Sequence, residues 1–156
     1  MAKKTPATKM LDAAGIAYSL HTYDYDPGAE RIGLQAAESL GVPGGCVVKT
    51  LMALVDGKPV CVMVPSDREV NMKKLAAAAA GKSAQMMKPA DAERLSGYHV
   101  GGISPFGQKR PAPAFVDQAA FAHAEIFLNG GQRGLQIKLK PGDAVAVLGA
   151  TVAPLT

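Results

Sequence analysis

Two apolar runs, residues 47–55 and 59–64, flank the dipeptide Asp56-Gly57 and constrain the fold more than any other stretch. Asp-Gly between runs rich in β-branched residues is typical of a tight β-hairpin. Both runs are apolar at odd and at even positions, so both faces of the hairpin must be covered. The sequence therefore predicts a hairpin that forms part of a barrel wall, with helices packed outside it.

Local signals divide the rest of the chain into short helices and strands. Thr5-Pro6, Asn71 and Pro89 are typical of helix starts, and glycines mark several helix ends. We expect helices over residues 6–14, 35–40, 72–80, 89–96 and 143–148, and further strands over 17–22, 84–87, 114–117, 125–129 and 135–139. The pattern predicts a mixed α+β fold, with strands mostly in antiparallel hairpins and helices packed around them.

Length and hydropathy favour one domain spanning residues 1–156. The chain is 48% hydrophobic and 19% charged, which suits one compact core. No run approaches the roughly 18 apolar residues of a membrane helix, and no apolar segment follows Lys3-Lys4 as in a signal peptide. We expect a soluble, cytoplasmic protein without internal repeats or linkers.

The only two cysteines are predicted to be reduced. The hairpin register sets Cys61 opposite Met52 and Cys46 opposite Asp67, so the two thiols do not face each other. We expect partly buried free thiols.

A formal net charge of +4, with basic residues spread along the chain, suits either a polyanionic partner or an ordinary solvated surface.

Residues 97–107 hold four glycines and Pro105 in a segment that is neither polar nor of low complexity. Glycine allows another molecule to approach the backbone, and proline fixes φ and removes a donor. The segment, here called the glycine loop, is therefore predicted to be a stiff loop that exposes N–H groups to a ligand.

Few side chains suggest chemistry by themselves. Lys49 is the one charged residue of its apolar strand; it either extends to the strand edge or points into a functional cavity. The histidines show no metal-ligand spacing, Asp24 and Asp26 are more simply turn formers than cation ligands, and no nucleophile motif surrounds Ser104. No phosphate loop or dinucleotide fingerprint is present. Such a site suits a reaction in which the substrate brings its own reacting group.

Five segments taken together resemble the YbaK family, free-standing relatives of the editing domain of bacterial prolyl-tRNA synthetases. They match in order along nearly the whole chain: residues 21–27 (HTYDYDP), 49–51 (KTL), 68–76 (REVNMKKLA), 97–105 (GYHVGGISP) and 130–135 (GGQRGL). The resemblance implies the fold class α+β with a mixed, largely antiparallel β-barrel surrounded by helices, which agrees with the predicted hairpin. It also implies removal of a wrong amino acid from tRNA, typically cysteine from tRNA(Pro), because a proline pocket rejects cysteine too weakly.

The resemblance also implies the site residues. Lys49 matches the family's essential lysine, Gly101 and Pro105 match its Gly-x-x-x-Pro loop, and Tyr23 matches a pocket tyrosine. It implies catalytic roles for Lys49 and Gly101 and substrate contacts for Tyr23, Gly102, Ile103, Ser104, Pro105, Asn129, Gly131 and Gln136, with no metal and no cofactor. Some relatives carry other residues at Asn129 and Gln136, which leaves the amino-acid preference open.

The expected mechanism is attack of the substrate's cysteine thiolate on its own ester carbonyl. The N–H groups of Gly101 and Gly102 then face the oxyanion, and Lys49 holds the terminal nucleotide. Three alternatives remain: a deacylase for alanine or another small residue that uses water or a ribose hydroxyl, a noncatalytic module that binds aminoacyl-tRNA or prolyl-tRNA synthetase, and a pocket for a small acidic metabolite. The expected partners are the acceptor end of aminoacyl-tRNA and, in addition, prolyl-tRNA synthetase, without a membrane.

Overall fold

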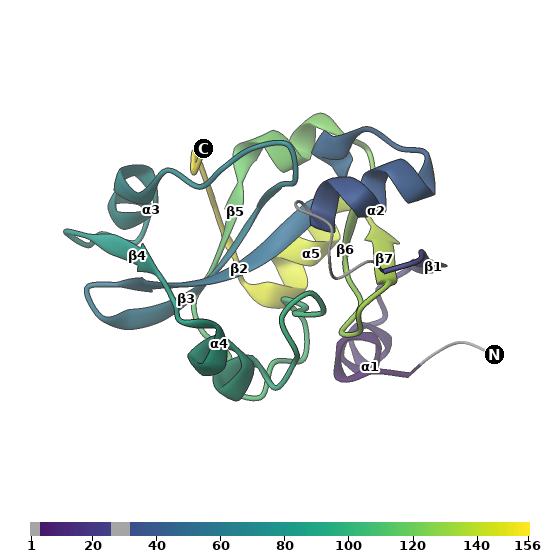
Figure 1. Cartoon of the computed structure of the whole chain (residues 1–156), viewed down its shortest axis with the longest axis horizontal. Helices are drawn as coiled ribbons and strands as arrows, with labels where there is room; N and C mark the ends of the chain where they lie inside the picture. The colour runs from purple at the N-terminus through teal and green to yellow at the C-terminus, as the bar shows by residue number, and fades with distance from the viewer. Residues whose placement is uncertain (1–3, 26–31) are drawn as a thin grey trace.

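The computed structural model describes residues 4–25 and 32–156 (Figure 1). Short helices alternate with short strands along the chain. In order the elements are α1 (Pro6–Ala13), β1 (Ser19–Thr22), α2 (Ile32–Leu40), η1 (Gly44–Cys46), β2 (Val48–Val55), β3 (Lys58–Pro65), α3 (Met72–Ala78), β4 (Ala84–Met86), α4 (Pro89–Ser96), β5 (Ala114–Asp117), η2 (Gln118–Ala122), β6 (Ile126–Asn129), β7 (Leu135–Leu139), α5 (Pro141–Leu148) and β8 (Thr151–Ala153).

The predicted hairpin is confirmed as β2 and β3, which pair antiparallel over eight residues each. Asp56 and Gly57 form the turn, with φ of 51° and 80°. Both central residues of a type I′ turn need positive φ, which explains the Asp-Gly pair. One face of the hairpin, with Met52 and Cys61, packs in the larger core; the other, with Val62, packs against α3. Both faces are buried, as the sequence predicts.

The strands form two sheets rather than the predicted barrel. The larger sheet has the order β4-β2-β3-β5-β8 and the smaller one β1-β7-β6. A single parallel bridge, Val47 to Phe127, links them. Closure fails among the described residues because β8 and β4 end the larger sheet as unpaired edges. The α+β class is confirmed; the closed barrel is wrong.

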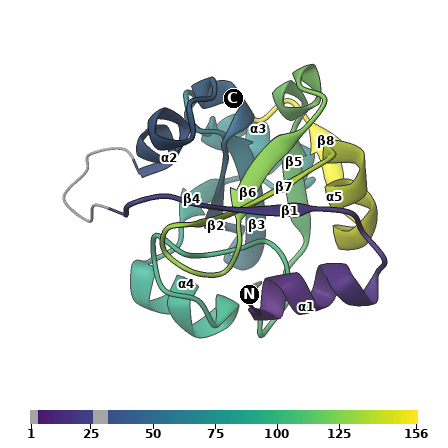
Figure 2. The same ribbon diagram turned by 90° about the vertical axis from the view of Figure 1, so that its right-hand side faces the viewer.

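Pairing is mixed and largely antiparallel, as predicted: four of the six strand pairs among the described residues are antiparallel, and β5 runs parallel to both β3 and β8. The parallel β3–β5 pair needs a long crossover, and this crossover contains α3, β4, α4 and the glycine loop. Figure 2 looks onto the smaller sheet, with α5 on one side and α2 on the other. The crossover thereby brings the glycine loop to the same end of the molecule as β6 and β7.

One edge of β2 stays open where the two sheets meet. β4 pairs only with Ala53, Leu54 and Val55. Residues 48–51 therefore have β3 on one side and, among the described residues, no strand ladder on the other. This unpaired edge is where the cavity described below begins.

Helix boundaries follow the capping residues that the sequence offered. Thr5 caps α1 through a reciprocal pair with Thr8, and Asn71 caps α3 by accepting from the Lys74 N–H at 3.1 Å. Gly97 ends α4 in the left-handed conformation. The structure extends α5 back to Pro141 and adds the three-residue strand β8, which the sequence did not predict.

Both cysteines are free and buried, and Cys61 lies opposite Met52 as predicted. Burial raises the pKa of the Cys61 thiol to about 12. Asp26 and most of the predicted turn after it lie outside the described residues. Within the described ranges, no helix has the length and apolarity to cross a membrane.

Candidate active site

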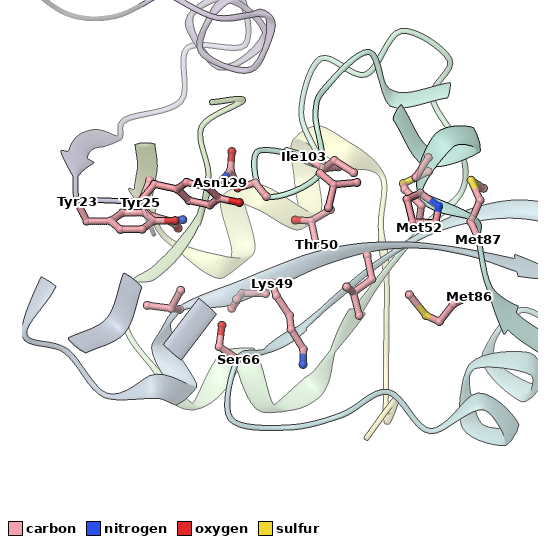
Figure 3. A pocket seen from close by; sticks show the side chains of 18 residues that line it. Tyr23, Tyr25, Lys49, Thr50, Met52, Ser66, Met86, Met87, Ile103 and Asn129 are labelled. Carbon is pink, nitrogen blue, oxygen red and sulfur yellow. Dashed lines mark hydrogen bonds between the residues drawn. The ribbon is translucent and has the colours of Figure 1, made fainter. Parts of the chain in front are cut away.

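A cavity of about 480 Å³ opens along the unpaired edge of β2 (Figure 3). Its walls are β2, the segment after β1, the ends of β6 and β7, the start of α4, and the glycine loop. Tyrosines and Asn129 gather at one end, and Met52, Met86 and Met87 at the other. This volume is typical of a pocket for a metabolite-sized group and far exceeds one small side chain.

Six of the ten predicted site residues line this cavity. They come from the segment after β1, from β2, from the glycine loop and from the β6–β7 hairpin: Tyr23, Lys49, Gly101, Ile103, Asn129 and Gln136. The pairing of Asn129 with Gln136 across β6 and β7 sets their side chains on the same face of the smaller sheet.

The other four predicted residues shape the glycine loop or its neighbour from behind. Ser104 is fully buried, and its hydroxyl accepts from the Phe106 N–H at 3.2 Å. Pro105 and Gly102 are also buried. A Cβ on Gly131 would approach the Tyr98 ring to 2.8 Å. None of the four lines the cavity.

Lys49 lies on the face of β2 opposite Thr50. Figure 3 shows Lys49 and Ser66 on one side of the strand and Thr50 pointing toward Ile103 on the other. The Lys49 side chain is 22% exposed, and its Nζ lies 3.4 Å from the Glu69 carboxylate, which is itself largely exposed. The structure therefore combines the two alternatives left by the sequence: Lys49 lines the cavity and its ammonium reaches the surface. A surface ion pair of this kind is weak enough to be exchanged for another anion.

The glycine loop brings the backbone of Gly101 to the cavity wall. Gly101 has φ of 90°, and a Cβ there would collide with the Tyr25 hydroxyl. The Gly101 N–H has no acceptor among the described residues, whereas the Gly102 N–H donates to the His99 carbonyl at 2.8 Å. The assignment of the Gly102 N–H to an oxyanion is therefore corrected, because a turn inside the loop already uses that donor.

Asn129 joins the glycine loop to the loop between β6 and β7. Its Nδ2 donates to the Gly101 carbonyl at 3.2 Å. Its Oδ1 accepts from the Gly131 N–H at 2.7 Å and from the Gln132 N–H at 3.2 Å. Much of the hydrogen-bonding capacity of this side chain is used within the protein, so its main visible role is to fix the two loops relative to each other.

Four buried side-chain oxygens lack a hydrogen bond among the described residues, and all four belong to residues that line the cavity. They are Tyr23 Oη, Thr50 Oγ1, Ser66 Oγ and Gln136 Oε1. Buried polar groups are normally paired. Their gathering in one cavity indicates a site for a polar ligand. The sequence reasoning missed Thr50 and Ser66; only the place of Thr50 beside Lys49 could have drawn attention to it.

The lining carries little acid–base chemistry. Burial raises the pKa of the Tyr23 hydroxyl, so Tyr23 stays neutral near pH 7. Among the described residues that line the cavity there is no histidine, cysteine or carboxylate. His99 is exposed and pairs with Glu93 outside the lining. No group of three or more His, Cys, Asp or Glu side chains in the described ranges could hold a metal ion.

An α+β fold whose open-edged strand carries a lysine and faces a glycine loop across a cavity defines a ligand-binding domain. The sequence profile of the aminoacyl-tRNA editing domain matches residues 26–146, and the chain belongs to this family. It falls in the YbaK/EbsC branch, as the resemblance predicted, and is by family an enzyme of aminoacyl-tRNA editing.

Individual relatives agree with this membership. The chain is 31% identical over 156 residues to Enterococcus faecalis EbsC, which is named as a candidate Cys-tRNA(Pro)/Cys-tRNA(Cys) deacylase; the match covers 99% of this chain and 94% of EbsC. It is 36% identical over 91 residues to a proline–tRNA ligase of Nitratidesulfovibrio vulgaris, covering 58% of this chain but only 16% of the ligase.

Solved structures show the same fold. A protein described as a candidate trans-editing enzyme for prolyl-tRNA synthetase superimposes with a TM-score of 0.82 at 22% identity, covering 99% of both chains. The hypothetical protein APE2540 superimposes with a TM-score of 0.85 at 24% identity, covering 97% of this chain and 99% of its own.

Proposed function

We propose that this chain is a trans-editing deacylase that removes cysteine from mischarged tRNA(Pro) by using the thiol of the substrate. The observation that supports it is the lining of the cavity, which among the described residues offers no histidine, cysteine or carboxylate as base or nucleophile. The name of EbsC supports the substrate class. A site without its own nucleophile suits a substrate that carries one.

In the proposed reaction the cysteine sulfur attacks the carbonyl carbon of its own ester. A C–S bond forms and the ester C–O bond to the ribose breaks, releasing a cyclic thiolactone. The thiol proton is transferred through solvent or the neighbouring ribose hydroxyl to the departing 3′ oxygen. The protein contributes orientation and stabilises the oxyanion.

The side chains divide this work between them. The Gly101 N–H is the oxyanion donor, and Lys49 exchanges Glu69 for an anionic or hydroxyl group of the terminal nucleotide. Tyr23 and Gln136 offer unpaired oxygens to the aminoacyl group. Ile103 and Asn129 shape the contact surface, while Gly102, Ser104, Pro105 and Gly131 hold the loops behind it.

Residues 1–156 are proposed to act as one editing domain on the acceptor end of tRNA. The chain spans about a sixth of the length of the proline–tRNA ligases that it matches. We therefore propose that selection of tRNA(Pro) is assisted by prolyl-tRNA synthetase in the cytoplasm. The modest net charge of +4 suits weak tRNA binding that a partner can strengthen.

The test is deacylation of cysteinyl-, alanyl- and prolyl-tRNA, alongside S-methylcysteinyl-tRNA. The proposal expects multiple turnovers on cysteinyl-tRNA(Pro) and loss of activity when the thiol is methylated. Retained activity on the methylated substrate moves the nucleophile to water or to the ribose hydroxyl. If the protein instead protects the aminoacyl ester at one-to-one stoichiometry and shows no turnover, the deacylase proposal is wrong and the chain is a binding module.

A further inference from the structure

The backbone of the glycine loop is fixed almost group by group between His99 and Gly102. The Val100 N–H donates to the Glu93 carboxylate at 2.8 Å, and the Val100 carbonyl accepts from Arg133 Nε at 2.9 Å. The carbonyls of Gly101 and His99 are also taken, by Asn129 and by the Gly102 N–H. Of the backbone groups from the His99 carbonyl to the Gly102 N–H, the Gly101 N–H alone has no partner among the described residues.

The Val100 carbonyl and the Gly101 N–H belong to one peptide group. A trans peptide is planar, and its C=O and N–H point in opposite directions. A donor that holds the Val100 carbonyl therefore also sets the direction of the Gly101 N–H. Gly101 lines the cavity, so the hydrogen bond from Arg133 is made to a peptide group at the cavity wall.

The guanidinium that makes this contact is itself held. It lies over the Tyr25 ring, 5.4 Å from the centroid. The Tyr25 hydroxyl in turn lies against Gly101, where a Cβ would collide with it. Figure 3 shows Tyr25 beside Asn129 at the polar end of the cavity. Tyr25, Arg133 and Asn129 thus contact Gly101 or one of the two peptide groups that flank it.

We propose that Arg133 is a positioning residue that aims and polarises the Gly101 N–H through the Val100–Gly101 peptide. A cation at the carbonyl end draws electron density from the amide and makes its N–H a stronger donor, because hydrogen bonds in a chain polarise one another. The expected effect of Arg133 on turnover rests on the proposed deacylase function, in which that N–H meets the oxyanion. The expected effect of Arg133 on the direction of the Gly101 N–H does not depend on that function.

An exposed arginine in a tRNA-binding protein has an obvious competing role, which is contact with a tRNA phosphate. The two roles predict different observables. A phosphate contact contributes to binding and to the salt dependence of KM, lowering the log–log slope by about one unit when removed. A positioning contact acts on kcat and leaves the binding of tRNA unchanged.

The kinetic test compares Arg133→Gln and Arg133→Lys with the control Arg110→Gln, an exposed arginine away from the cavity. With cysteinyl-tRNA(Pro) we expect kcat to fall about tenfold in Arg133→Gln, as for loss of one charge-assisted hydrogen bond. KM and its salt slope should not change, Arg133→Lys should recover part of kcat, and Arg110→Gln should match the wild type. A raised KM with a lowered salt slope and normal kcat overturns the proposal.

The second test needs no substrate. In ¹H–¹⁵N spectra of the free protein, Arg133→Gln should shift the Gly101 amide resonance and leave that of Gly57, in the distant hairpin turn, in place. An unmoved Gly101 resonance overturns the proposal even if turnover falls. If the wild type deacylates no aminoacyl-tRNA, the proposed function fails, and this spectrum alone still decides the role of Arg133.

Discussion

The two walls of the cavity are held in place in different ways. β2 is fixed by its backbone, which pairs with β3 along eight residues. Residues 99–102 of the glycine loop belong to no strand, and side chains from other segments fix them: Glu93, Asn129 and Arg133. The backbone groups of β2 are used in strand pairing, so its side chains are free to contact a ligand. In the glycine loop the contacts come from side chains of other segments, so a backbone N–H stays free to contact the ligand.

This difference predicts two kinds of failure. A substitution on β2 that faces the cavity should remove activity and leave stability unchanged, since the β2–β3 ladder does not depend on that side chain. A substitution in the glycine loop should alter activity and local structure together. Variants in the two walls can therefore be sorted by measuring turnover and the free energy of unfolding on the same samples.

Lys49→Ala has the largest expected effect on activity. Lys49 is the only cation that lines the cavity among the described residues, and loss of a group that orients the substrate costs on the order of 100-fold. We expect near-complete loss of cysteine release from cysteinyl-tRNA(Pro), with an unchanged free energy of unfolding in urea. Lys58→Ala, at the exposed start of β3, is the matched control and should behave as wild type.

Wild-type release of cysteine by Lys49→Ala would remove Lys49 from the site. A large loss of stability in that variant would instead contradict the view that backbone pairing alone holds this wall.

Gly101→Ala should lower both the deacylation activity and the stability of the protein. The residue has φ of 90°, which alanine rarely adopts, and the new Cβ would collide with the Tyr25 hydroxyl. Strain of this kind costs about 1–3 kcal/mol. Because the N–H is retained but displaced, we expect deacylation to fall by about 10-fold to 100-fold together with a lower midpoint of urea unfolding.

A matched control is Gly142→Ala in α5, where no atom lies within 4 Å of the added Cβ. Normal stability of Gly101→Ala would show that the loop yields without strain, and the contrast between the walls would then fail.

The same contrast explains what the sequence could predict. Asp56-Gly57 and its apolar flanks define the β2–β3 hairpin from local information, and the structure confirms its register down to Cys61 opposite Met52. The parallel pairing of β3 with β5 has no local signal, because it depends on a crossover of about 50 residues. The predicted barrel was wrong because β4 and β8 end the larger sheet as unpaired edges, which no local signal indicates either.

The site residues, too, could be predicted only where the signal is local. Lys49 could be predicted as a site residue because one cation in an apolar strand is unusual. Ser66 was not visible, because an isolated serine after β3 carries no pattern, and Gly102 looked like an oxyanion donor until the turn to His99 was known. The role inferred for Arg133 depends on a hydrogen bond across 33 positions of sequence, which no spacing rule indicates.

The smallest predicted effect concerns the buried face of the hairpin. Burial raises the pKa of Cys61 from 9.0 to about 12, so the folded protein keeps the thiol protonated where the unfolded chain ionises. The stabilisation from this group is complete below about pH 9 and is lost as the pH rises toward 12. Between pH 8 and 10 we expect Cys61 to account for a decline of about 1 kcal/mol in the free energy of unfolding.

Cys61→Ala should flatten that decline in urea titrations at the two pH values. Cys46, whose pKa burial also raises, and Tyr98, whose pKa burial raises to about 12, add to the same trend in both proteins, so only the difference between wild type and variant reports on Cys61. An identical pH dependence in both would show that water reaches this thiol. Cys61 pairs with Met52 in β2, the strand that forms one wall of the cavity. Such a result would therefore also mean that water penetrates this wall, although its backbone is paired along eight residues.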